Sequence, residues 1–284
     1  MIVWALLISL FNVYSIFCYR YLPEKLSQTY SYNDNNIHNE KIINITNVPH
    51  HALIVHGDRY CSGNLIHSKI VLSAASCIRQ RNQNPCIVKV GSSSMIGRGQ
   101  VINVVEIKNH EYFGYSSRMD NDIAMLVLQK HVEFGPNVKK TILVQPDVAL
   151  RDGVPVKVSG WGSVNVPPNQ INKLLQSDMI ILNKEECIKY YGNLMTPSNF
   201  CAKYPLERRL SDNGGSAVYR NFLVGILSFG ATNKEEPFVA VFTNVSYFYR
   251  WIMINSHQLL KKYCVKDVNY RSMSLEYVDN INKK

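Results

Sequence analysis

Three short segments hold side chains that could take part in acyl-transfer chemistry. Ser76 carries a hydroxyl and directly precedes a cysteine, Asp122 carries a carboxylate, and Asn213 carries a carboxamide inside the turn of residues 211–216. Such chemistry needs a nucleophile, a base that accepts the nucleophile's proton, and a carboxylate that orients the base. Of these three side chains, only Asp122 suits one of those parts.

The other two positions lack the atoms that the reaction needs. The hydroxyl of Ser76 titrates far above physiological pH, so it cannot store a proton as an imidazole does. The amide nitrogen of Asn213 has a delocalised lone pair and is not a practical nucleophile towards peptides. Because losing one member of such a unit already costs about 10⁴- to 10⁶-fold in turnover, we expect no peptide hydrolysis here.

The segments that must position these residues are short apolar runs separated by turns. Many short strands between turn residues indicate an all-β sandwich or barrel. The runs cover residues 52–56, 60–66, 87–90, 101–107, 123–128, 154–158, 174–182, 223–229 and 239–245, and Gly57 and Asp58 separate the first two.

Two helices are expected within this β pattern. Asn183 is placed as an N-cap, with the acidic Glu186 at the third helical position. A longer helix is expected to start at Ser246, because Phe248, Trp251 and Leu259 follow at helical spacing.

Together these motifs resemble the trypsin-like serine proteases of the chymotrypsin fold (peptidase family S1). The resemblance implies two packed six-stranded β-barrels with a C-terminal helix, over a domain of residues 42–258. The residues that carry it, in chain order, are Lys41-Ile42-Ile43, the stretch 71–77 that ends in Cys77, the stretch 120–126, Ser159-Gly160-Trp161-Gly162, Cys187 to Cys201, the turn 211–216, and Ser228-Phe229-Gly230.

The same resemblance places Ser76 at the catalytic histidine position and Asn213 at the catalytic serine position. Ser211 stands where the family has a glycine of the oxyanion hole. Loss of both base and nucleophile resembles the scabies-mite inactivated protease paralogues, which implies a pseudoprotease that binds proteins and interferes with host defence such as complement. The alternatives are a weakly active or cryptic endopeptidase, and a decoy that occupies protease inhibitors.

The resemblance also implies an activation site and a substrate pocket. Cleavage between Lys41 and Ile42 would free an amino group that forms a salt bridge with Asp212. The alternative is that Asp212 only hydrogen-bonds its own turn.

For the pocket, the resemblance implies Glu207, Ser228 and Gly230 as lining residues. We expect a narrowed or blocked pocket, because bulky residues follow Pro237. The alternative is an intact pocket with a shifted alignment.

The ends of the chain suggest export. Residues 1–18 are apolar and are expected to be a signal peptide, with an uncleaved anchor helix as the alternative. Residues 19–41 are a polar, propeptide-like leader, and residues 259–284 are a C-terminal extension. We therefore expect a secreted, extracellular protein with no membrane attachment after signal cleavage.

The seven cysteines fit an oxidising compartment. The family resemblance implies the disulfides Cys61–Cys77 and Cys187–Cys201. For Cys86 and Cys264 three states stay open: a third pair, two free thiols, or a link to another chain.

Asn44 and Asn244 begin glycosylation sequons.

The net charge of +10 comes without a run of Lys and Arg interleaved with aromatics, so we expect protein partners and no nucleic acid. No HExxH or CxxC spacing occurs, and we expect neither a metal nor a cofactor.

Overall fold

The strand-and-turn pattern folds into two rings of antiparallel strands. The computed structural model describes residues 41–78, 85–146, 150–164, 172–204, 209–210, 212–230 and 238–281. The signal segment and nearly all of the leader, residues 1–40, lie outside the described residues.

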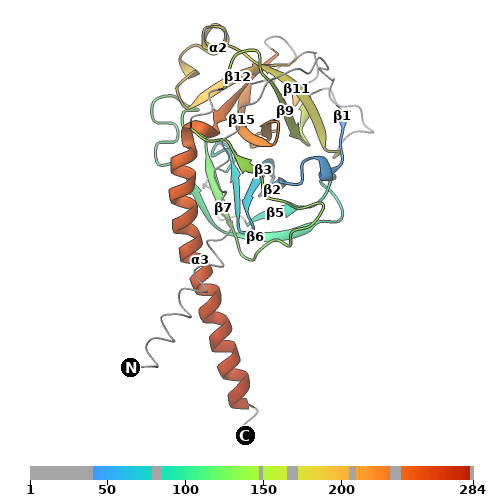
Figure 1. The fold of residues 1–284 in the computed structure, drawn as a ribbon, viewed down its shortest axis with the longest axis vertical. Coiled ribbons are helices and arrows are strands. Elements are labelled where there is room, and N and C mark those ends of the chain that lie inside the picture. Colours follow the sequence, from blue (N-terminus) through green and yellow to red (C-terminus); the bar gives the residue numbers. More distant parts are fainter. Residues whose placement is uncertain are drawn as a thin grey trace. The chain divides into compact units, whose positions relative to one another are not determined.

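The first ring is a closed barrel with the strand order β2-β3-β4-β7-β6-β5, closed by pairing of β5 with β2 (Figure 1). Its strands are β2 (His51–His56), β3 (Arg59–His67), β4 (Ile70–Ser73), β5 (Cys86–Val90), β6 (Gln100–Asn109) and β7 (Ala124–Leu128).

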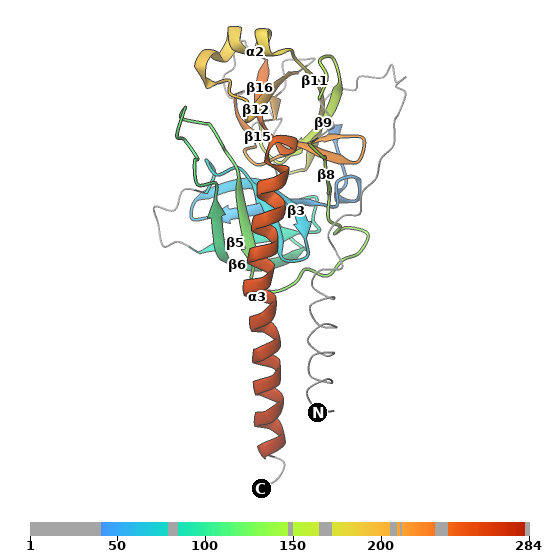
Figure 2. The ribbon, with the colours of Figure 1, turned by 60° about the vertical axis from the view of Figure 1, so that its left-hand side comes forward.

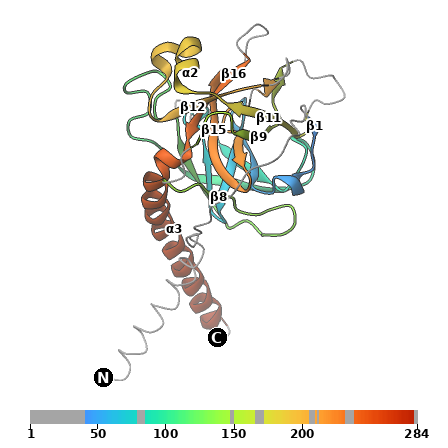
Figure 3. The same ribbon diagram turned by 45° about the horizontal axis from the view of Figure 1, so that its top comes forward.

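The second ring follows the order β11-β12-β16-β15-β14-β9 and closes where β9 pairs with β11 (Figure 3). The predicted pair of six-stranded antiparallel barrels is therefore confirmed. The strands are β9 (Pro155–Gly160), β11 (Leu175–Ile181), β12 (Asn199–Lys203), β14 (Ser216–Tyr219), β15 (Phe222–Gly230) and β16 (Val239–Asn244).

Short strands extend this framework. β1 (Lys41–Ile42) pairs with β11, β8 (Ile142–Leu143) pairs in parallel with β15, and β10 (Ser163–Val164) pairs with β13 (Arg209–Leu210).

The helices are η1 (Ile45–Asn47), α2 (Lys184–Tyr191), η3 (Gly192–Leu194) and α3 (Val245–Ile281) (Figure 2). The Oδ1 atom of Asn183 accepts a hydrogen bond from the Glu186 N–H at 2.8 Å, which confirms the predicted cap of α2. The C-terminal helix begins one residue before the predicted Ser246 and continues to Ile281.

Local sequence explains the first hairpin. Gly57 and Asp58 form a two-residue turn between His56 and Arg59, which are paired in register. Gly57 has φ of 64°, and a glycine in this region at the first turn position matches the twist of the flanking strands.

The chain divides between Arg250 and Trp251 into two compact units, and both barrels lie in the unit that ends at Arg250. The domain boundaries expected from the sequence, including the one after residue 258, stay predictions.

Buried histidines are the least expected part of the barrel core. His50 is 8% exposed, its Nε2 atom has no hydrogen-bond partner among the described residues, and burial lowers its pKa to about 4. The folded protein therefore holds His50 neutral at pH values where the unfolded chain is protonated.

This difference in the protonation of His50 between the folded and unfolded chain predicts that acid lowers the stability of the fold. The folded pKa of His50 lies below its ordinary value of 6.5, so its contribution to stability is complete above pH 6.5 and is lost as the pH falls towards 4. Replacing His50→Phe removes about 1.4 kcal/mol per pH unit from the slope of unfolding free energy against pH in that window. Urea unfolding at several pH values measures this slope. Equal slopes for both proteins would contradict the neutral, buried state of His50.

Candidate functional site

A contact between Asp122 and Ser76 forms the centre of the site. Asp122 precedes β7 and is 1% exposed, and Ser76 lies in the turn after β4. Oδ1 of Asp122 accepts the Ser76 backbone N–H at 2.6 Å, and Oδ2 accepts the Ser76 hydroxyl at 2.7 Å. The serine therefore binds the carboxylate in the place that the resemblance assigns to an imidazole.

The second barrel supplies a further donor to the same carboxylate. The Ser228 hydroxyl on β15 donates to Oδ2 of Asp122, and the Thr243 hydroxyl on β16 donates to the Asp122 backbone oxygen at 2.7 Å. Burial raises the pKa of Asp122, while the hydrogen bonds from Ser228 and Ser76 oppose that rise. The donors on this carboxylate are hydroxyl and backbone N–H groups.

Backbone hydrogen bonds bring the turn of Asn213 to the same strand. The Gly214 N–H donates to the Leu227 oxygen at 2.7 Å, and the Leu227 N–H donates to the Gly215 oxygen at 2.8 Å. Since Ser228 follows Leu227, the contact between Ser76 and Asp122 and the turn of Asn213 converge on one part of β15.

Glycine is required at the centre of this turn. Gly214 has φ of +87°, and a Cβ there would collide with the Ser62 oxygen and the Ser73 hydroxyl. The Ser62 N–H also donates to the Asn213 oxygen at 2.9 Å. The turn is thus packed against β3, even though Asn213 replaces the serine.

The arrangement offers little for catalysis. The base in contact with Ser76 is a carboxylate that several donors share, and a carboxylate is far less basic than an imidazole. The Asn213 side chain is partly buried and forms no hydrogen bond with the described residues.

The Asp212 carboxylate binds residues that lie far from its own turn. In the continuous chain, Oδ2 of this carboxylate accepts from the Ser62 hydroxyl at 2.7 Å and from the Trp161 N–H at 2.6 Å. The alternative that its side chain bonds only within its own turn is therefore wrong. The salt bridge to Ile42 requires cleavage after Lys41 and stays a prediction.

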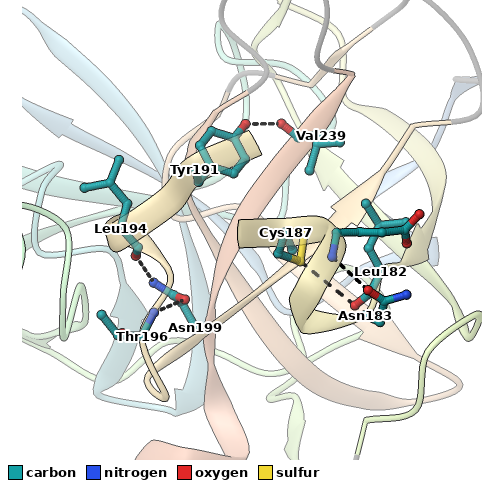
Figure 4. Close-up of a disulfide and its surroundings, with 10 residues drawn as sticks. Leu182, Asn183, Cys187, Tyr191, Leu194, Thr196, Asn199 and Val239 are labelled. Carbon is teal, nitrogen blue, oxygen red and sulfur yellow. Dashed lines mark hydrogen bonds between the residues drawn. A yellow bond between two sulfur atoms is a disulfide. The ribbon is translucent and has the colours of Figure 1, made fainter. Parts of the chain in front are cut away.

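Part of the expected pocket is described. Ser228 is buried, and Gly230 has φ of +88° with the Tyr191 hydroxyl where a Cβ would lie. Tyr191, at the end of α2, packs edge-on against Phe229 and donates its hydroxyl proton to the Val239 oxygen (Figure 4). Glu207 and the oxyanion position Ser211 lie outside the described residues, so the narrowed pocket stays a prediction.

Two disulfides brace the framework, as the resemblance implied. Cys61–Cys77 lies in the first barrel, and Cys187–Cys201 lies in the second (Figure 4). The possible third disulfide between Cys86 and Cys264 is wrong, because Cys86 is a buried free thiol whereas Cys264 is in a disulfide. The spacing gave no guide to this outcome, since pairing depends on the distance between the two Cα atoms.

Sequence reasoning missed a polar cluster around Asp120. Its Oδ1 accepts hydroxyl protons from Thr196 at 2.8 Å and Ser198 at 2.7 Å, so the loop before β7 is tied to the segment before β12. Burial alone would raise the pKa of Asp120, but hydrogen bonds from Ser116 and Ser198 hold it below its usual value. Thr196 and Ser198 lie more than 70 positions from Asp120, at a separation that no local motif reveals.

Lys41 and Ile42 are both exposed in β1. Asn44 is exposed, and Asn244 is partly buried with its Oδ1 accepting the Ser246 N–H at 3.1 Å at the start of α3. Cleavage and glycosylation at these positions stay predictions.

Within the described residues, no group of three or more His, Cys, Asp and Glu side chains could hold a metal ion. No helix in the same part of the chain is both long and apolar enough to cross a membrane.

The contact at Asp122 makes a stability prediction. Ser76→Ala removes a hydroxyl donor from a buried carboxylate and lowers the unfolding free energy at pH 7 by about 1.5–3 kcal/mol. Asn213→Ala is the matched control, and it shifts stability by no more than about 0.5 kcal/mol because its side chain has no such bond. Chemical denaturation of both variants measures the difference, and equal effects would contradict the assigned role of Ser76.

Comparison with known proteins agrees with this geometry. The family profile "Trypsin" matches residues 38–252. The vitellin-degrading protease of Bombyx mori is 29% identical over 78% of this chain and 86% of its own length. Hypodermin-A of Hypoderma lineatum is 30% identical over 72% of this chain and 80% of its own length.

Among solved structures, the scabies mite inactivated protease paralogue S-D1 superposes with a TM-score of 0.69. It covers 76% of this chain and 95% of its own, at 23% identity, so this likeness concerns the fold alone. The family profile, the twin barrels and the positions of the degenerate residues lead to one assignment: this chain belongs to the trypsin family of serine proteases.

Proposed function

We propose that this chain is a secreted, catalytically inactive member of the trypsin family that acts by binding other proteins. The observation that carries the proposal is the pairing of Ser76 with Asp122, which fills the position of the missing imidazole. Asn213 at the nucleophile position adds a second, independent loss.

The contacts at Asp122 indicate an adapted site. In a protease that had lost only its histidine, the buried carboxylate would lack a donor, at a cost of about 1–3 kcal/mol or more. Here Ser76 donates both its backbone and hydroxyl protons to that carboxylate, and Ser228 adds a third. The scaffold therefore stays stable without the chemistry.

Protein binding is the use that the retained framework supports. Both barrels and their disulfides persist, although the groups for acyl transfer are missing. Following the resemblance to the scabies-mite paralogues, we propose host proteins as partners, complement components among them. The basic net charge of +10 favours partners with acidic surfaces.

A serine-directed phosphonate probe tests the absence of catalysis. We expect no stoichiometric adduct on the wild-type chain, with or without cleavage after Lys41, because no base activates a nucleophile. An active trypsin-family protease serves as positive control, and the single variants Ser76→His and Asn213→Ser stay unlabelled because each restores one group only. Stoichiometric labelling of wild type that disappears in Ser76→Ala would overturn the proposal in favour of a cryptic endopeptidase.

The decoy alternative predicts a different result. A decoy must present an open pocket to protein protease inhibitors, so such inhibitors would bind the purified chain and displace its partner. Binding of purified complement components that persists in the presence of saturating inhibitor supports a surface away from the site.

A further inference from the structure

The carboxylate of Asp212 is buried without a cationic partner among the described residues. It is 7% exposed, and its Oδ2 accepts three protons, from the Ser62 hydroxyl at 2.7 Å, the Trp161 N–H at 2.6 Å and the Gly162 N–H at 3.3 Å. Burial raises its pKa, and the Ser62 hydroxyl is the foremost group that opposes the rise. A side chain 150 positions away in sequence thus holds the carboxylate in the uncut chain.

Proton counting fixes the direction of the bonds around Ser62. Its hydroxyl has one proton, which goes to Asp212, yet its oxygen also lies 2.9 Å from His51 Nε2. His51 must therefore carry its proton on Nε2 and donate it to Ser62. Burial lowers the pKa of His51 to about 3, so the ring is neutral and Nδ1 is left as an acceptor, 3.5 Å from the Ser159 hydroxyl.

The result is a directed chain of donors from His51 through Ser62 to Asp212. Aligned hydrogen bonds polarise one another in a site that excludes water. His51 and Ser62 are fully buried, and the ring of His51 packs 4.8 Å from that of Trp161. Burial and ring packing therefore hold the side chains of this donor chain in place.

The space around Oδ2 of the Asp212 carboxylate is already occupied. An added Cβ at Gly160 would lie 2.6 Å from Asp212 Oδ2 and 2.7 Å from Asp212 Cβ. The Trp161 and Gly162 N–H groups occupy the same oxygen. A further donor to Oδ2 would have to displace Ser62 or a backbone N–H group.

Ile42 is held by strand pairing with β11 in the uncut chain. It pairs with Leu175 in β1, its side chain is 49% exposed, and the Ile43 N–H donates to the Leu174 oxygen at 2.9 Å. To reach Asp212, an amino group freed at Ile42 would have to leave this pairing.

Ser62 also holds the turn that follows Asp212. Its hydroxyl binds the carboxylate, and its backbone N–H donates to the Asn213 oxygen at 2.9 Å. The Gly215 N–H closes the turn by donating to the Asp212 oxygen at 2.9 Å. The turn is thereby anchored to β3 in the continuous chain.

We propose that Ser62, supported by His51, takes the part of a freed amino terminus, so that the turn of residues 212–216 is set without cleavage after Lys41. The protein then needs no proteolytic activation to reach its working conformation. This inference departs from the Ile42–Asp212 salt bridge implied by the sequence. It concerns the scaffold and holds whether or not the chain hydrolyses peptides.

The test compares cut and uncut forms of the full-length chain. Residues 37–41 are exchanged for the recognition sequence of a specific processing protease, so that cutting leaves Ile42 as a new amino terminus. We expect Tm to agree within about 2 °C between the two forms. We also expect the Ile42 amine to react with an acylating reagent as fast as in the urea-unfolded protein. A cut form that gains several degrees in Tm and protects its amine would overturn the proposal.

A serine variant sharpens the comparison. Ser62→Ala lowers Tm by about 4–8 °C in both the cut and uncut forms and speeds hydrogen exchange at the Gly215 amide. Ser62→Thr keeps the hydroxyl and serves as the rescue. Ser73→Ala removes a buried serine that donates to the Ser62 oxygen at 2.7 Å and controls for general loss of a buried hydroxyl, because it leaves Asp212 bonded. If Ser62→Ala destabilised only the uncut form, Ile42 would have replaced Ser62 and the inference would be wrong.

Discussion

Burial of two carboxylates that have no cationic partner among the described residues is the constraint on which the site depends. Asp122 and Asp212 both lie in the interior, and burial raises the pKa of each. An unpaired buried charge is strongly destabilising, so each carboxylate must find donors. Ser76 serves Asp122 and Ser62 serves Asp212, each with a hydroxyl at 2.7 Å.

Serine hydroxyls can satisfy the two buried carboxylates without supplying the groups that acyl transfer needs. A hydroxyl satisfies a carboxylate as a donor, yet it neither carries a positive charge nor accepts a proton near neutral pH. The twin barrels can therefore keep both aspartates buried without an imidazole or a freed amino group beside them. The scaffold stays available for binding.

Much of the fold could be predicted from local sequence. The Gly57-Asp58 turn, the Asn183 cap and the short apolar runs are each decided by residues within a few positions, and the structure confirms them. The degenerate positions were also readable, because their flanking motifs remain intact. Their roles as partners of one another were not, since Ser76 and Asp122 are 46 positions apart.

The remaining features depend on contacts that sequence does not display. The bond between Ser62 and Asp212 spans 150 positions and requires both barrels to be packed. The adjacent pair His50 and His51 gave no sign that Nε2 of His50 lacks a hydrogen-bond partner among the described residues while His51 orients a serine. The state of Cys86 likewise depends on which Cα atoms the fold brings together.

The most direct measurement of the central claim is cleavage of a diverse peptide library, followed by mass spectrometry, for the full-length wild type and an Asp122→Asn variant. If Asp122 only stabilises the scaffold, both proteins release products at the same background rate as buffer. Turnover by the wild type that Asp122→Asn abolishes would show that this carboxylate still drives catalysis and would contradict the account.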